Sequence, residues 1–261
     1  MKDTLTVVKI GGKVINEEAE LDLFLKKFAA LKGNKILVHG GGNIASVVQN
    51  KMGIPPKMVE GRRITDADAI DIVTMVFSGL NKKIVSKLQA LNVQSIGLSG
   101  ADGNLIRSVK RPVKTIDYGF VGDVEEVNSE LLKSLFDAGL VPVVCALTHD
   151  NQGQLLNTNA DTIASELARG VADKYQVDLV YCFEQPGVLS DFENKVVIPE
   201  ITPEGYEKYK SEGVIVDGMI PKLDNAFDAI NAGVDTVKIC HFDSLDKVQS
   251  EDYPGTTLCL K

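Results

Sequence analysis

The stretch ILVHGGGN, residues 36–43, joins an apolar, strand-like run to His39 and three consecutive glycines. Glycine lets the backbone turn tightly or approach a ligand closely. We expect a helix to begin near Asn43, and the free N–H groups of a helix start attract anions. The run matches neither the dinucleotide-binding glycine pattern nor a Walker A loop. Taken alone, it therefore leaves a bare turn and a phosphate cradle both open.

Outward from this stretch, short apolar segments alternate with helix-length amphipathic segments. Such alternation predicts an α/β fold with an open, mostly parallel β-sheet sandwiched by helices. The expected strands are LTVVKI (5–10), KILVHG (35–40), SIGLSG (95–100), LVPVVCAL (140–147), DLVYCF (178–183), VDTVKIC (234–240) and TTLCLK (256–261), and the expected helices cover 17–31 and 67–91 or begin near 43 and 159. A hairpin over 105–127, with turn signals at Asp102-Gly103 and Tyr118-Gly119, interrupts the pattern. We predict two lobes, residues 1–174 and residues 175–261.

The composition excludes several classes of protein. A net charge of −8 argues against nucleic-acid and anionic-membrane partners. The sequence has neither an apolar run of membrane-spanning length nor a signal peptide, so we expect a cytoplasmic protein. Cys145, Cys182, Cys240 and Cys259 are scattered in apolar contexts, which favours reduced, buried thiols. The histidines lack metal-ligand spacing, so no protein-held metal is predicted.

Two cation-bearing stretches are candidates for anion binding. In VVKIGGKV, Lys9 stands in an apolar strand before Gly11 and Gly12, which indicates either a buried anion partner or an edge-strand lysine facing solvent. In VDGMIPKLDNA, Lys222 follows Pro221 near a helix start, where its charge opposes the helix dipole. A lysine at that position is expected where an anion is bound.

Two polar stretches are candidates for holding the rest of a ligand. In EGRRITDAD, Thr65 or Asp66 is expected to cap the next helix, while the arginine pair 62–63 is either a solvated surface or a grip for a carboxylate. In QLLNTNADTIASELA, Asn159 is expected to cap a helix with Asp161 in its first turn. Asn157, Asn159 and Asp161 share one face if the backbone there is extended.

Together, KIGGK, HGGGN, GRRITD, NTNAD and DGMIPKL occur in the order seen in the amino-acid kinase family, and the chain resembles that family from Leu5 to its end. GRRITD and NTNAD are typical of the branch that phosphorylates N-acetyl-L-glutamate in arginine biosynthesis, and the similarity includes VGDVEEVN (121–128). The resemblance implies that the N-terminal lobe binds the acylated glutamate and the C-terminal lobe binds ATP, with Mg²⁺ carried by the nucleotide.

The resemblance also implies roles for individual residues. Lys9 and Lys222 flank the transferred phosphoryl group, and Asp161 positions both lysines. The remaining implied contacts are Gly11, Gly12 and Glu184 for the nucleotide, and Gly41, Gly42, Arg63, Asn157 and Asn159 for the substrate. The acceptor carboxylate, with a pKa near 4.3, is already ionised at neutral pH, so the reaction needs no general base.

The chain departs from the family pattern in two places. Phe183, Glu184, Gln185 and Pro186 stand where relatives usually carry Ser/Thr-Asp-Val beside the nucleotide, so Glu184 is expected to replace the usual aspartate. The first expected strand begins near Thr4, without the preceding helix of hexameric, arginine-inhibited relatives, which predicts an arginine-insensitive homodimer. Alternatives that stay open are an N-succinyl-L-glutamate kinase, a carbamate kinase-like enzyme and a non-catalytic nucleotide-binding regulator; an aspartokinase would need a longer chain.

Overall fold

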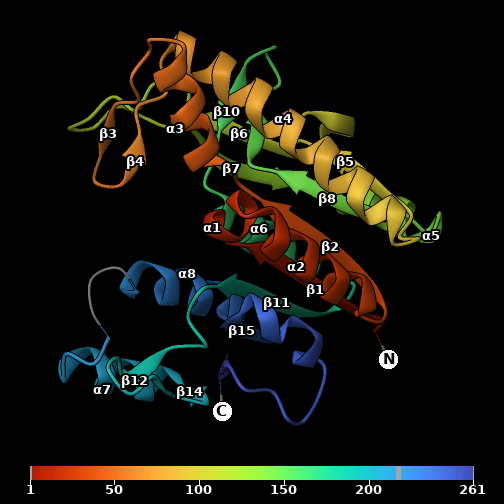
Figure 1. The fold of residues 1–261 in the computed structure, drawn as a ribbon, viewed down its shortest axis with the longest axis vertical. Coiled ribbons are helices and arrows are strands. Elements are labelled where there is room, and N and C mark those ends of the chain that lie inside the picture. Colours follow the sequence, from red (N-terminus) through yellow and green to blue (C-terminus); the bar gives the residue numbers. More distant parts are fainter. Residues whose placement is uncertain (1, 216–218, 261) are drawn as a thin grey trace. The chain divides into compact units, whose positions relative to one another are not determined.

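Strands and helices alternate along the chain as the sequence predicts, and helices cover a mostly parallel sheet (Figure 1). The computed structural model describes residues 2–215 and 219–260. Its contacts divide the chain into two units, residues 1–36 with 164–261 and residues 37–163. These units are defined by internal packing, whereas the predicted lobes are defined by the ligand each binds, so the lobe assignment stays a prediction.

The first unit is built on parallel strands. Its strand order is β14-β16-β15-β11-β1, followed by residues 34–36 of β2. β1 pairs with β11 from Thr4↔Gln176 to Ile10↔Cys182, and β11 pairs with β15, both in parallel, while β16 runs antiparallel to β15. The strands are β1 (Thr4–Ile10), β2 (Asn34–His39), β11 (Gln176–Phe183), β12 (Leu189–Asp191), β13 (Val196–Val197), β14 (Glu200–Ile201), β15 (Thr236–His241) and β16 (Thr256–Leu258). The helices are α1 (Gly12–Asn16), α2 (Glu18–Ala30), α6 (Ala160–Val171, entering from the other unit), α7 (Pro203–Ser211), α8 (Ile220–Asn231) and the 3-10 turn η2 (Phe242–Lys247).

The second unit combines a parallel and a mixed sheet. Residues 37–39 of β2 pair in parallel with β8, which pairs in parallel with β5. The second sheet has the order β10-β9-β6-β7, and its antiparallel β6–β7 pair is the predicted hairpin. The strands are β3 (Met58–Val59), β4 (Arg62–Arg63), β5 (Ser95–Leu98), β6 (Ile106–Lys110), β7 (Gly122–Val127), β8 (Val141–Cys145), β9 (Leu147–His149) and β10 (Leu155–Asn157). The helices are α3 (Gly42–Lys51), α4 (Ala67–Ala90), α5 (Ser129–Asp137) and the 3-10 turn η1 (Asp102–Asn104).

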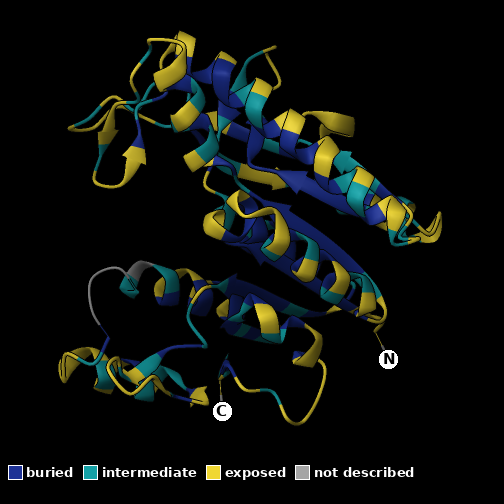
Figure 2. Ribbon diagram, in the orientation of Figure 1, coloured by how far each residue is buried: buried dark blue, intermediate teal, exposed yellow. Residues whose placement is uncertain are grey.

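Burial follows the residue pattern from which the elements were predicted. Strands of continuous apolar residues are buried, and helices bury one face and expose the other (Figure 2). In the second unit, Ile70, Val73 and Phe77 on α4 pack against Ala45 of α3 and Leu147 of β9. This packing fixes the start of α3, which carries the glycine run.

The four cysteines do not form disulfides. The closest pair, Cys182 and Cys240, occupies paired positions on β11 and β15, and the two sulfur atoms lie 3.8 Å apart. A disulfide bond is about 2.05 Å long, so these thiols are reduced, as predicted. Among the described residues, no helix is both long and apolar enough to cross a membrane.

Candidate active site

Two lysines from distant parts of the first unit meet at one aromatic ring. Lys9, near the end of β1, is only 9% exposed, and its Nζ lies 5.0 Å from the centroid of the Phe183 ring. Lys222, in the first turn of α8, places its Nζ 4.0 Å from the same centroid. The two nitrogen atoms therefore cannot be further apart than the sum of these distances. Since β1 lies between β11 and β2, the alternative of an edge-strand lysine facing solvent is wrong.

The glycines beside Lys9 differ in their surroundings. Gly11 donates its N–H to the carbonyl of Cys182 at 3.0 Å, and a Cβ at Gly11 would also lie 3.0 Å from that oxygen. Close packing of this turn against the end of β11 thus explains Gly11 without a ligand. Gly12 is exposed at the first position of α1, and Glu184 is exposed directly after β11. Their nucleotide contacts stay predictions, and the first two residues of the DGMIPKL stretch, 217 and 218, lie outside the described residues.

In the second unit, two glycines of the run have different surroundings: Gly41 packs closely against another side chain, and Gly42 faces open space. A Cβ at Gly41 would lie 2.9 Å from the Phe77 ring, whereas a Cβ at Gly42 would meet no atom within 4 Å. Gly42 is exposed and begins α3, and no side chain in the described part of the protein caps this helix end. Packing therefore requires glycine at 41, while Gly42 leaves its N–H accessible to an anion.

A buried histidine fixes the strand end before the glycine run. His39 is fully buried, and its Nδ1 donates to the carbonyl of Gly40 at 2.8 Å. Its Nε2 then accepts from the side-chain amide of Asn81 at 3.1 Å, and the same amide donates to the carbonyl of Val143 at 2.9 Å. This assigns the neutral Nδ1–H tautomer. Burial, opposed by the bond to Gly40, lowers the pKa of His39 to about 4.

The arginine pair divides into one exposed and one buried side chain. Arg62 is exposed on β4, but Arg63 is only 8% exposed. Arg63 donates to the carbonyl of Gly42 and to Oγ of Ser46, both at 2.8 Å, and to Oε1 of Gln49. All three acceptors are neutral, and burial lowers the pKa of Arg63. These bonds use three of the five N–H donors of Arg63, so a buried positive charge retains donors for a ligand carboxylate.

The NTNAD stretch takes a different shape from the extended backbone considered above. Asn157 ends β10 and donates to Oγ1 of Thr65 at 3.1 Å. Asn159 caps α6 as predicted, because its Oδ1 accepts from the backbone N–H of Asp161 at 2.7 Å and of Thr162 at 3.3 Å. Asp161 lies in the first helical turn, also as predicted. The condition for one shared face, an extended backbone through Asp161, is therefore not met, since the helix begins at Ala160.

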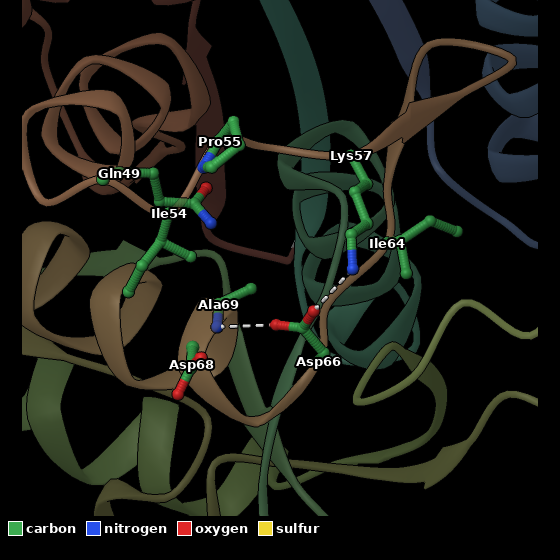
Figure 3. A pocket seen from close by; sticks show the side chains of 9 residues that line it. Gln49, Ile54, Pro55, Lys57, Ile64, Asp66, Asp68 and Ala69 are labelled. Carbon is green, nitrogen blue, oxygen red and sulfur yellow. Dashed lines mark hydrogen bonds and ion pairs between the residues drawn. The ribbon is translucent and has the colours of Figure 1, made fainter.

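A separate cavity of about 290 Å³ lies between the loop after α3 and the start of α4 (Figure 3). Asp66 stands at its wall, accepting from the N–H of Ala69 at 3.1 Å and pairing with Lys57 at 3.5 Å. Asp66, rather than Thr65, thus caps α4. None of the predicted substrate-binding residues lines this cavity, although Gln49, the partner of Arg63, does.

Comparisons with known proteins identify the family of this chain. A family model described as "Amino acid kinase family" matches residues 4–241. The chain belongs to this family. It is 57% identical to an acetylglutamate kinase of Bacteroides fragilis over 92% of each chain, and 55% identical to one of Cytophaga hutchinsonii over 95% of each chain. The solved structure of smu.665 from Streptococcus mutans has a TM-score of 0.78 at 25% identity, covering 98% of this chain and 99% of that one.

Within this member of the amino acid kinase family, the structure shows several contacts at the candidate site that the sequence analysis did not predict. Phe183 gathers the two lysines, Gln49 holds Arg63, and Asn81 holds His39. Each contact joins segments separated by at least 14 positions, which sequence spacing does not reveal. The one available signal was the unusual Phe183 in a stretch that departs from the family pattern.

Proposed function

We propose that this protein transfers the γ-phosphoryl group of ATP to the side-chain carboxylate of N-acetyl-L-glutamate, a step of arginine biosynthesis. The curated relatives described above carry the name of this activity. The observation that carries the proposal is Arg63, a buried guanidinium whose hydrogen-bond acceptors among the described residues are all neutral. A buried charge without a counter-ion is costly, and an acceptor's α-carboxylate supplies the missing anion.

For the nucleotide, the proposal assigns Lys9 and Lys222 to the transferred phosphoryl group. Two ammonium groups held at one ring repel each other, and a polyphosphate between them relieves that repulsion. Gly11, Gly12 and Glu184 are assigned to the remaining nucleotide contacts, and Mg²⁺ arrives with ATP. Among the described residues, no group of three or more His, Cys, Asp or Glu side chains is arranged to hold a metal ion.

For the acceptor, the proposal assigns Arg63, Asn157 and Asn159 to the acyl-glutamate and the N–H groups of Gly41 and Gly42 to the reacting carboxylate. A carboxylate oxygen attacks the γ-phosphorus, the bond from that phosphorus to the β–γ bridging oxygen breaks, and ADP leaves as the acyl phosphate forms. The acceptor is ionised at neutral pH, so no proton has to be removed. Asp161 is assigned to orienting the lysines and keeping them charged.

The lobe assignment belongs to the same proposal: residues 1–174 for the acyl-glutamate and for dimerisation, and residues 175–261 for ATP. So do a homodimeric state and a cytoplasmic location. Sedimentation of the purified protein tests the dimer, and a measured mass other than that of two chains would contradict it.

The decisive experiment is a coupled assay of ADP release with a panel of acceptors: N-acetyl-L-glutamate, N-succinyl-L-glutamate, L-glutamate and carbamate. Hydroxylamine converts an acyl phosphate into a hydroxamate, which identifies the product as carboxyl-linked. We expect turnover and hydroxamate with N-acetyl-L-glutamate above all other acceptors. Preference for the succinyl compound would change the acyl group, and ATP binding without turnover on any acceptor would overturn the proposed reaction.

The adjacent residues Arg62 and Arg63 provide a matched pair of variants to test whether the buried Arg63 guanidinium binds the acceptor. Arg63→Ala should raise KM for the acceptor by about 10- to 100-fold, the usual worth of a charge-assisted bidentate contact, with little change in KM for ATP. Arg62→Ala removes the same charge from an exposed position and should change either constant less than about twofold. Because Arg63 is buried, Arg63→Lys and a thermal unfolding curve of each variant separate loss of binding from loss of fold.

A further inference from the structure

Phe183 ends β11, and the side chains of Lys9 and Lys222 both reach its ring. The ammonium nitrogen of Lys9 lies 5.0 Å and that of Lys222 4.0 Å from its ring centroid, both within the range of a cation–π contact. The ring is itself fixed in place. It stacks on Tyr181 at a centroid distance of 6.2 Å and an interplanar angle of 12°, and a Cβ at Gly11 would lie 3.8 Å from its edge.

A fixed aromatic ring can restrain a flexible lysine side chain. A lysine side chain carries its charge on a flexible stem with four rotatable carbons, so an unrestrained ammonium samples many positions. The face of an aromatic ring attracts a cation through its quadrupole and carries no net charge, so it restrains the ammonium without adding a negative charge that would compete with the nucleotide.

We propose that Phe183 is a positioning residue that holds the ammonium groups of Lys9 and Lys222 together for the transferred phosphoryl group. This inference rests on the proposed function, since it presupposes phosphoryl transfer at these lysines. Lysines already in place do not have to be ordered when charge builds up in the transition state. Loss of the ring should therefore reduce kcat more than it raises KM for the acceptor.

Graded fluorination of the ring tests this with almost no change of shape. Phe183 is replaced by 4-fluoro-, 3,5-difluoro- and 3,4,5-trifluorophenylalanine, which weakens the attraction for a cation step by step. We expect log kcat to fall in proportion to the number of fluorine atoms, reaching about a tenfold loss for the trifluoro ring. The same series at Phe24, a core ring stacked on Phe28, should leave kcat unchanged. Phe183→Tyr should retain most of the activity, and Phe183→Leu should lose at least as much kcat as the trifluoro ring does.

A second measurement needs no turnover. In the ligand-free protein, the ε-methylene protons of Lys9 and Lys222 should show ring-current shifts that disappear in Phe183→Leu. Absence of these shifts would overturn the inference. So would a flat kcat across the fluorinated series in a protein that phosphorylates N-acetyl-L-glutamate, and that outcome would leave the proposed function intact. Failure of the unsubstituted protein to turn over any acceptor would instead overturn the proposed function, and this inference with it.

Discussion

Protonation of His39 should weaken the fold, because both ring nitrogens are already committed. Nδ1 donates to Gly40, and Nε2 accepts from Asn81, so a proton on Nε2 would face the N–H groups of the Asn81 amide. The side chain is fully buried, and burial is the main reason why its pKa falls from 6.5 to about 4. The unfolded chain therefore binds this proton at a higher pH than the folded protein does.

The sign and size of the effect follow from linkage. Above about pH 6.5, His39 is neutral in both states and adds no pH dependence. Between about pH 6.5 and about pH 4, only the unfolded state gains the proton, so the free energy of unfolding falls by about 1.4 kcal/mol per pH unit. The loss from this one group is about 2 kcal/mol at pH 5 and about 3 kcal/mol at pH 4, below which it levels off.

Urea unfolding of the wild type and of His39→Gln at several pH values isolates this contribution. The glutamine variant should be less stable at pH 7, since it loses buried contacts, yet its stability should fall by about 2 kcal/mol less between pH 6.5 and pH 5. With three histidines in the chain, imidazole signals can be assigned by NMR, and His39 should remain the Nδ1–H tautomer at pH 5. Equal pH dependence in both proteins, or a His39 titration midpoint near 6.5, would refute this account.

Two further predictions concern helix starts in the second unit. Gly41→Ala should lower the free energy of unfolding by about 1–3 kcal/mol, because the new Cβ would contact Phe77. Gly42→Ala places its Cβ in open space, so this variant should keep its stability and lose turnover. A stability loss in both variants on urea unfolding would contradict this. Asp66→Ala should cost about 0.5–2 kcal/mol by uncapping α4, and Asp68→Ala should cost less, so equal thermal shifts of the two variants would show that the cap contributes little.

The sequence predicted the elements that depend on local residue pattern better than those that depend on pairing with distant strands. Continuous apolar runs such as DLVYCF predicted buried parallel strands, because only a strand covered on both faces tolerates them. The run LVPVVCAL was predicted as one strand, yet it forms β8 and β9, which join different sheets. The change of sheet depends on pairing with distant strands, and composition within the run does not encode it.

At the site, motifs located the residues but did not describe their environments. The sequence allowed two environments for Lys9, burial beside an anion or exposure to solvent. The position of β1 between two other strands decides between them. The two arginines of GRRITD are alike in sequence, but β4 buries Arg63 and exposes Arg62. The supporting contacts of Gln49 and Asn81 come from helix faces, and a single sequence indicates a helix face without indicating what it touches.

The bond from Arg63 to the carbonyl of Gly42 ties a short hairpin to the first turn of α3. Ser46 reinforces the tie, since it donates to that same carbonyl and accepts from Arg63. In the proposed reaction, the groups assigned to the two ends of the acceptor would thus belong to one hydrogen-bonded unit. Substitutions of Arg63 and Ser46 should therefore give non-additive losses of activity when combined. An acceptor that lacks its α-carboxylate should also react more slowly at its side-chain carboxylate.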